Sequence, residues 1–151
     1  MHNSFQLDVE APPETVFEWL GDPERFMQWA KGVVENEPLE ETPDKVGSTF
    51  RQVYEERGRK MEFQGRVTAW EANRRLGIAM TSSCFDLDVD YTLEPTPQGT
   101  RLTQDSEVTF KGFMRFVAPL MAPFMKKSGE KCIREDFGRL KALAEGRTPD
   151  A

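Results

Sequence analysis

The chain has 151 residues, of which 38% are hydrophobic and 30% charged, and its formal net charge is −6. A chain of this length fits a single domain that buries about 68–70% of the surface its unfolded form exposes, so its core needs no disulfide or metal. The acidic net charge opposes the attraction to phosphates on which nucleic-acid binding rests, and we expect no nucleic-acid partner.

The start of the chain and its cysteines bear on the cellular compartment. A polar, alternating stretch follows Met1 in place of a signal segment, and no stretch approaches ~18 apolar residues. We therefore expect a cytoplasmic protein with no integral membrane segment. Cys84 and Cys132 are too far apart for a CxxC pair, which favours reduced, buried thiols over a disulfide or a zinc site.

Residues 1–32 predict one strand and two short helices. The strand covers residues 3–10, where apolar and polar side chains alternate. The first helix begins at Pro13, because proline and the acidic residue after it both suit a first turn. Asp22 can cap the second helix, which begins at Pro23 and stops at Gly32.

Residues 33–110 are predicted to form six antiparallel strands in a meander, because stretches of alternating polarity are separated by short turn sequences. Strand 85–94 is the clearest, with an apolar residue at every odd position. An earlier strand is expected to share one face among Met61, Phe63, Gly65, Val67 and Ala69. The strand around Tyr54 is ambiguous: the faces 50, 52, 54 and 49, 51, 53 differ little in polarity, and either could point inward.

The last strand of this meander holds two polar residues, Gln104 and Ser106, in an apolar row that begins at Leu102. A buried amide or hydroxyl without a partner costs about 1–3 kcal/mol, so these side chains would need a ligand, water or neighbouring group. They could orient a carbonyl or hydroxyl of a bound molecule. The alternative is a bulge that turns this face outward.

After residue 112 the pattern becomes helical as far as Leu143. The stretch 113–125 is very apolar but holds Pro119 and Pro123, so a kink or a new helix start is expected there, followed by an amphipathic helix from Ser128 to Ala144. The methionines and prolines of 113–125 predict a deformable surface that could form a pocket mouth. A kinked helix start packed on the sheet, or a dimer contact, is the alternative.

Four stretches carry a resemblance to a known superfamily. They are residues 9–17 with 22–26 and Trp29, residues 67–76 (VTAWEANRRL), residues 91–94 with 99–103, and Pro119-Leu120 with residues 140–145. In these stretches the chain resembles the START-like, or Bet v 1-like, superfamily, and within it the bacterial polyketide cyclase/dehydrase and lipid-transport branch.

The resemblance implies an α+β helix-grip fold, in which a curved antiparallel sheet of about seven strands wraps around a long C-terminal helix. The domain would cover residues 1–146, and residues 147–151 would form a disordered tail. The superfamily includes lipid carriers, aromatase/cyclases, plant hormone receptors and Hsp90 co-chaperones. Membership therefore implies a pocket and leaves its chemistry open.

The implied pocket lies between the concave face of the sheet and the C-terminal helix. Its lining is predicted from three parts of the chain: the side chains on the inward face of each strand, the short helix that holds Phe26, and the apolar start of the last helix. The residues expected to contact a ligand are Trp29, Tyr54, Phe63, Val67, Ile78, Met80, Phe85, Leu87, Val89, Tyr91, Leu102, Gln104, Ser106, Phe116, Leu120, Met121 and Phe124.

This lining favours reversible binding of a small hydrophobic molecule, such as a lipid, a polyketide or an aromatic compound, by a monomer or homodimer. Catalysis has less support. The only histidine is His2, near a terminus, so Ser–His, Cys–His and His-based metal schemes lack a base or ligand, and no metal or cofactor is expected. Two alternatives remain: a polyketide cyclase or dehydratase that uses the same pocket, and a co-chaperone-like protein-interaction module.

Overall fold

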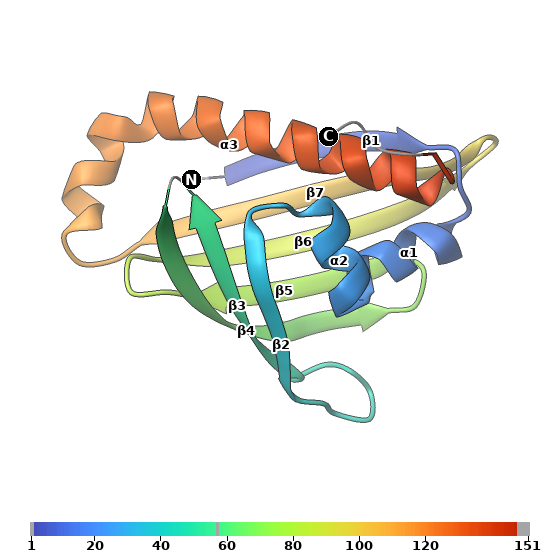
Figure 1. The fold of residues 1–151 in the computed structure, drawn as a ribbon, viewed down its shortest axis with the longest axis horizontal. Coiled ribbons are helices and arrows are strands. Elements are labelled where there is room, and N and C mark those ends of the chain that lie inside the picture. Colours follow the sequence, from blue (N-terminus) through green and yellow to red (C-terminus); the bar gives the residue numbers. More distant parts are fainter. Residues whose placement is uncertain (1, 57, 148–151) are drawn as a thin grey trace.

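The computed structural model describes residues 2–56 and 58–147, without the side chains of residues 56, 122, 124–126, 128 and 129. The order of its elements is the one predicted: a strand, two short helices, six strands and a long helix (Figure 1). They are β1 (His2–Val9), α1 (Pro13–Gly21), α2 (Pro23–Trp29), β2 (Val33–Glu40), β3 (Thr49–Glu56), β4 (Arg59–Glu71), β5 (Arg75–Thr81), β6 (Phe85–Thr96), β7 (Gly99–Phe110) and α3 (Met114–Ala144). Of the expected tail, only residue 147 lies within the described residues.

The strands form one antiparallel sheet in the order β1-β7-β6-β5-β4-β3-β2. Strands β2 to β7 follow one another as the predicted meander, and β1 joins its far edge beside β7. Figure 1 shows the sheet curving beneath α3, which lies along β1, while α1 and α2 lie at one end. The α+β helix-grip architecture is therefore confirmed.

The core lies where α3 and α2 pack over the β1, β6 and β7 part of the sheet. Phe137 of α3 is its centre, with ring centroids 5.2 Å from Phe5, 5.7 Å from Trp29 and 6.5 Å from Tyr91. Leu102 and Leu140 beside it are fully buried. Burial of these side chains supplies the main driving force for closing the helix onto the sheet.

The two short helices are held by polar contacts at their junction. The Asp22 Oδ1 accepts hydrogen bonds from the backbone N–H groups of Glu24 at 2.9 Å and Arg25 at 3.3 Å, so the predicted cap of α2 is formed. The Trp29 Nε1 donates to the backbone carbonyl of Trp19 at 2.8 Å. This bond ties the end of α2 to α1 and satisfies the polar group of a buried tryptophan.

Helix α3 is continuous through both prolines, which resolves the choice between a kink and a new start. Figure 1 shows the helix changing direction in its first half. A proline removes one backbone hydrogen bond and crowds the carbonyl four residues earlier, so a bend at Pro119 and Pro123 is the expected result. The first half of α3 therefore follows a different path from the half that packs on the core.

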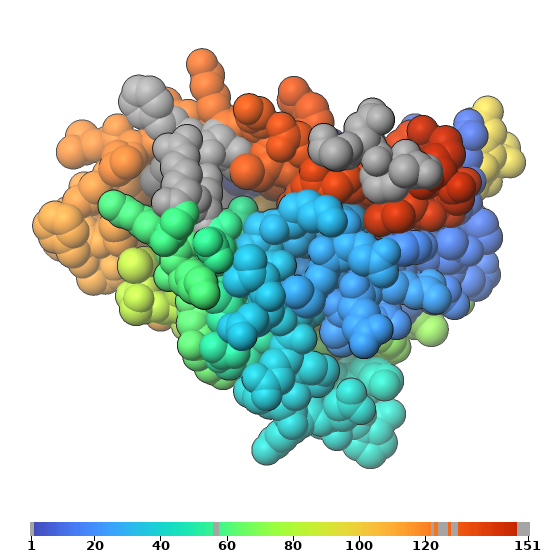
Figure 2. Space-filling view, in the orientation of Figure 1, coloured from blue at the N-terminus to red at the C-terminus, as the bar shows by residue number. Residues whose placement is uncertain are grey.

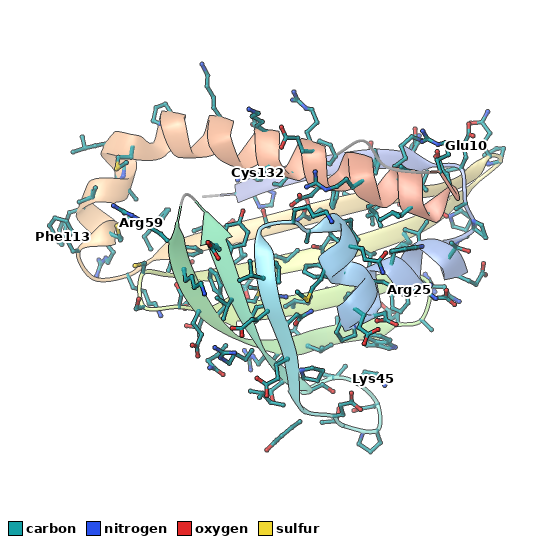
Figure 3. The ribbon with its side chains drawn as sticks, in the orientation of Figure 1. Glu10, Arg25, Lys45, Arg59, Phe113 and Cys132 are labelled. Carbon is teal, nitrogen blue, oxygen red and sulfur yellow. The ribbon has the colours of Figure 1, made fainter. Side chains whose placement is uncertain are left out.

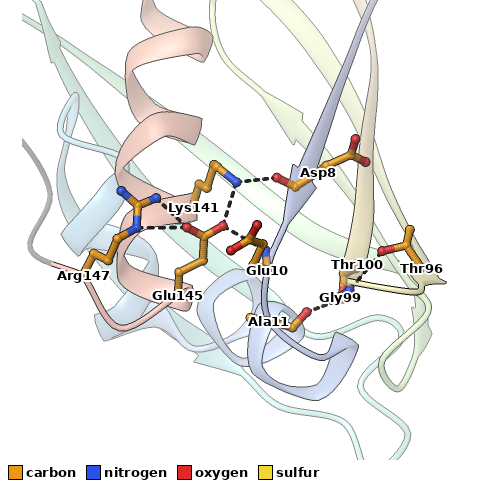
Figure 4. A network of polar contacts seen from close by, with 9 residues as sticks. All are labelled: Asp8, Glu10, Ala11, Thr96, Gly99, Thr100, Lys141, Glu145 and Arg147. Atoms are coloured by element: carbon orange, nitrogen blue, oxygen red, sulfur yellow. Dashed lines mark hydrogen bonds and ion pairs between the residues drawn. The ribbon is translucent and has the colours of Figure 1, made fainter.

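The end of α3 is tied to the end of β1 by a buried carboxylate (Figure 4). The Glu145 Oε2 accepts hydrogen bonds from the Lys141 Nζ at 2.6 Å and from the backbone N–H of Glu10 at 2.8 Å, and Arg147 donates to its Oε1. Burial alone would raise the pKa of Glu145, but these donors outweigh it and lower the pKa to about 2.

A bulge in β4 corrects one predicted row. Val67 pairs with Ile78, but the next pairs are Ala69 with Gly77 and Trp70 with Leu76, so one extra residue lies in β4. The expected row from Met61 to Ala69 holds only as far as Val67. Beyond the bulge Trp70 takes the inward position that alternation alone assigned to Ala69.

The ambiguous strand β3 presents Phe50, Gln52 and Tyr54 to the concave side. A Cβ on Gly65 would lie 2.3 Å from the Phe50 ring, and a Cβ on Gly32 would lie 2.3 Å from the Tyr54 ring, so both rings cover a glycine. This close approach of ring to backbone is possible only because neither glycine carries a side chain.

Candidate functional site

The concave side of the sheet holds a cavity of about 210 Å³ between the α1–α2 junction and strands β2 to β5. Figure 2 shows α1, α2 and β2 packed against one another on this face, with the loop of residues 41–48 projecting beyond them. The helices wall one side of the cavity, and the inward rows of β3, β4 and β5 form the other. Its lining thus comes from six consecutive elements, α1 to β5, and from the loop of residues 41–48.

The floor and inner wall of the cavity are apolar. Strands β4 and β5 supply Val67, Trp70, Leu76 and Ile78, and the helices supply residues that include Leu20 and Phe26. The Trp70 ring meets the edge of Phe17 with centroids 4.9 Å apart, which fixes its orientation from behind. An apolar molecule placed here would exchange water for aromatic and aliphatic contacts.

One buried amide faces this apolar floor. Gln52 is 7% exposed and lines the cavity, and no hydrogen bond joins its side chain to another residue within the described part of the chain. Its amide faces the open space of the cavity, since among the described residues the Gln104 Oε1 is the one fully buried side-chain nitrogen or oxygen without a partner. Gln52 can donate through its N–H₂ group and accept through its carbonyl, so it suits a ligand hydroxyl or carbonyl.

The loop of residues 41–48 forms the rim of the cavity and is fixed to β4 at the bulge. The Val67 N–H donates to the carbonyl of Ser48, and the Gly47 N–H donates to the carbonyl of Val67, both at 2.8 Å. Inside the loop the Thr42 Oγ1 donates to the carbonyl of Val46 at 2.7 Å. Lys45, at the tip, places its Nζ 5.9 Å from the centre of the Trp70 ring.

A smaller cavity of about 30 Å³ lies between β1, β7 and α3. Gln104 and Ser106 line it together with Phe5 and Ile133. The Gln104 Oε1 is buried and has no hydrogen-bond partner among the described residues. The space suffices for a water molecule, and a water there would supply the missing donor.

A partly buried polar cluster lies on α3, where Asp136 pairs with Arg139. The Arg139 Nε donates to the carbonyl of Trp29 at 3.0 Å, which fixes the guanidinium. Burial raises the pKa of Asp136, although Arg139 acts in the opposite direction. Burial, with a contribution from the charge of Asp136, also raises the pKa of Tyr91. Neither Asp136 nor Tyr91 lines the 210 Å³ cavity.

Comparison with known proteins decides the family. A family model described as polyketide cyclase / dehydrase and lipid transport matches residues 4–145, which is nearly the whole chain. The chain belongs to this family. Membership confirms the resemblance to the START-like, or Bet v 1-like, superfamily, a superfamily of hydrophobic ligand-binding folds. The comparison with curated proteins found no match.

Solved structures show the same fold at low sequence identity. The protein TTHA0849 from Thermus thermophilus is 16% identical, with a TM-score of 0.81 over 97% of this chain and 98% of that one. The Zhui aromatase/cyclase from Streptomyces sp. R1128 is also 16% identical, with a TM-score of 0.80 over 96% and 93%. The protein CV1439 from Chromobacterium violaceum is 23% identical, with a TM-score of 0.74 over 99% of each chain.

The predicted ligand contacts divide into separate groups in this member of the polyketide cyclase family. Val67 and Ile78 line the 210 Å³ cavity, and Gln104 and Ser106 line the small one. The others on the sheet continue the concave face or lie in the core. These are Tyr54, Phe63, Met80, Phe85, Leu87, Val89, Tyr91 and Leu102, together with Trp29 on α2. Their contact with a ligand stays a prediction.

The predicted contacts on α3 lie elsewhere. Phe116 is 77% exposed, Leu120 82% and Met121 47%, and none of them lines the cavities described above. The side chain of Phe124 lies outside the described residues. The bend in α3 is the physical reason, because it carries this part of the helix away from the path of the core-packed half (Figure 1).

Sequence reasoning missed most of the cavity wall. Phe50, Gln52, Trp70 and Leu76 line it, and none was among the predicted contacts. The inward position of Gln52 could have been predicted from the sequence, since Gln52 shares a strand face with the aromatic residues Phe50 and Tyr54. The inward position of Trp70 could not, because it depends on the bulge in β4.

Other chemistries can be judged from the same structure. Across residues 2–56 and 58–147, no group of three or more His, Cys, Asp or Glu side chains is placed to hold a metal ion. Cys84 and Cys132 are both half-buried. Within those residues, too, no helix combines the length and the hydropathy needed to cross a membrane.

Proposed function

We propose that this protein binds a compact hydrophobic molecule with a hydroxyl or carbonyl group in the 210 Å³ cavity. The observation that carries the proposal is the placement of Gln52, a largely buried residue whose amide makes no hydrogen bond among the described residues, in the same lining as the apolar side chains of Trp70, Leu76 and Ile78. Burial of apolar area would drive binding at about 25 cal/mol per Å², and Gln52 would orient the ligand.

The size of the cavity limits the ligand. Pockets for drug-sized ligands usually enclose about 300–1,000 Å³, and this one encloses about 210 Å³. A molecule of one or two fused rings suits that space better than a long acyl chain. The Trp70 ring, held by Phe17, offers a flat aromatic surface on which such rings can stack.

Binding is favoured over catalysis by the position of the titratable groups. The groups with a raised pKa, the buried Tyr91 and the partly buried Asp136, would be the natural proton donors or acceptors, and they lie outside the lining of this cavity. A bound ligand would meet the Gln52 amide and apolar walls inside the cavity, whereas the ionisable residues of the lining, Glu40, Glu41 and Lys45, are exposed to solvent. The amide and the apolar walls orient and desolvate a molecule without moving a proton.

The proposal is tested with 2-naphthol and naphthalene, which differ only in the hydroxyl. We expect saturable binding of both to purified protein, measured by isothermal titration calorimetry, with 2-naphthol bound more tightly. Gln52→Leu removes the hydrogen-bonding groups at similar side-chain volume. It should abolish the preference for 2-naphthol and leave the affinity for naphthalene within about threefold.

Two controls complete the experiment. Ile78→Phe adds volume to the cavity floor and should weaken binding of both compounds, whereas Leu39→Ser, which changes an exposed side chain on β2, should weaken neither. Mass spectrometry of an organic extract from natively purified protein would identify a retained ligand. The proposal fails if neither compound binds and the extract holds no small molecule.

A further inference from the structure

The start of α3 exposes an apolar stripe that no described contact covers. Phe113 is 78% exposed, Phe116 77% and Leu120 82%. Their spacing of three and then four residues places them on one face of the helix. Figure 3 shows Phe113 pointing away from the body of the protein at the end opposite α1. Isolated exposed apolar residues are ordinary, but a row of three large ones marks an interaction surface.

The charge of the same segment differs from that of the chain as a whole. Residues 108–129 contain four basic residues, Lys111, Arg115, Lys126 and Lys127, and no Asp or Glu, although the chain carries a net charge of −6. Lys111 is paired with Asp86 at 3.0 Å, while Arg115 and Lys127 are exposed. The apolar stripe is thus set in a locally basic segment of an acidic protein.

We infer that this stripe docks on the surface of an anionic lipid bilayer. A helix with Phe and Leu on one face and Lys or Arg beside them lies in the plane of a membrane interface, where the apolar side chains enter the acyl boundary and the basic ones meet anionic headgroups. The bend in α3 supports this arrangement, because it directs the first half of the helix away from the core-packed half (Figure 1).

A second copy of the chain fits the stripe less well. Symmetric pairing of two such segments would bring the basic residues of one copy toward those of the other, with no acidic residue in residues 108–129 to offset them. An anionic bilayer satisfies the apolar and the basic features together. The stripe also lies apart from the 210 Å³ cavity, so docking and ligand binding can be tested separately.

Vesicle flotation tests the inference with the full chain. We expect flotation with vesicles of phosphatidylcholine and phosphatidylglycerol, little with phosphatidylcholine alone, and release at high salt. Phe116→Ser combined with Leu120→Ser should lower the fraction bound about tenfold or more, because two large apolar side chains no longer enter the bilayer. Arg115→Glu should weaken binding to the anionic vesicles at low salt.

The matched control is Leu39→Ser, which removes a side chain that is 48% exposed on β2, outside the basic segment. It should float like the unchanged protein. Far-ultraviolet circular dichroism of each variant verifies that the helix is kept. The inference is overturned if the unchanged protein stays unbound, if all variants float equally, or if sedimentation shows a dimer that depends on Phe116 and Leu120 without vesicle binding.

Discussion

The Nζ of Lys45 lies 5.9 Å from the centre of the Trp70 ring, and both side chains line the 210 Å³ cavity. We expect the two partners to contribute unequally to stability. Lys45 is exposed, so Lys45→Gln should lower the free energy of unfolding by less than about 1 kcal/mol. Trp70 also packs on Phe17, and Trp70→Ala should cost about 3 kcal/mol. Urea unfolding measures both, and equal losses would contradict the assignment.

Phe137 and Phe116 form a matched pair on the same helix. Phe137 is 2% exposed and lies against Phe5 and Trp29, so Phe137→Ala should lower the free energy of unfolding by about 3–5 kcal/mol. Phe116 is 77% exposed, and Phe116→Ala should change it by less than about 0.5 kcal/mol. Thermal denaturation without lipid compares the two. A large loss at Phe116 would mean that the start of α3 packs on the sheet.

Glu145 should make stability depend on pH in the acid range. Its pKa is lowered to about 2 in the folded protein from an ordinary value near 4.5, so its stabilising contacts with Lys141 and Glu10 are complete above pH 4.5. They are lost as the pH falls from about 4.5 toward 2. Near pH 7, Glu145→Gln should lower the free energy of unfolding by about 1–2 kcal/mol.

The check on Glu145 is the difference between the unchanged protein and Glu145→Gln, measured by urea unfolding from pH 7 downward. This difference should shrink as the pH falls below about 4.5, since protonation removes the same charge that the substitution removes. A difference that stays constant to pH 2 would show that the charge of Glu145 contributes nothing.

Gln104 should tolerate loss of its polar groups. Its Oε1 is buried without a partner among the described residues, so Gln104→Leu removes an unsatisfied acceptor at nearly constant volume. The free energy of unfolding should stay equal or rise by about 1 kcal/mol. If it falls by more than about 1 kcal/mol, the oxygen has a partner, of which a water in the 30 Å³ cavity is the natural candidate.

Two glycines should respond to alanine in opposite ways. A Cβ on Gly65 would lie 2.3 Å from the Phe50 ring, so Gly65→Ala should displace that ring, narrow the 210 Å³ cavity and lower stability. A Cβ on Gly138 of α3 meets no atom within 4 Å, and Gly138→Ala should raise the free energy of unfolding by about 0.5–1 kcal/mol. Thermal denaturation and naphthalene binding distinguish the two changes.

The sequence by itself determined the order and type of the elements, because these depend on contacts between near neighbours. Alternation at 85–94 defines both faces of β6, and the Asp22-Pro23 pair specifies the start of α2. The prolines at 119 and 123 indicated the bend in α3. Local geometry imposes these features wherever the chain folds, and the helix-grip architecture followed from them together with the family resemblance.

Only the tertiary structure decided which residues surround the cavity. The bulge in β4 reverses the alternation after Val67 and brings Trp70 inward, and it is defined by pairing with β5 and by the loop bonded to Val67. The inward face of β3 depends on Phe50 covering Gly65 of the neighbouring strand. These positions are set by contacts between residues distant in the sequence. The two-residue alternation of a strand and the 3.6-residue period of a helix reflect only neighbouring residues and cannot predict them.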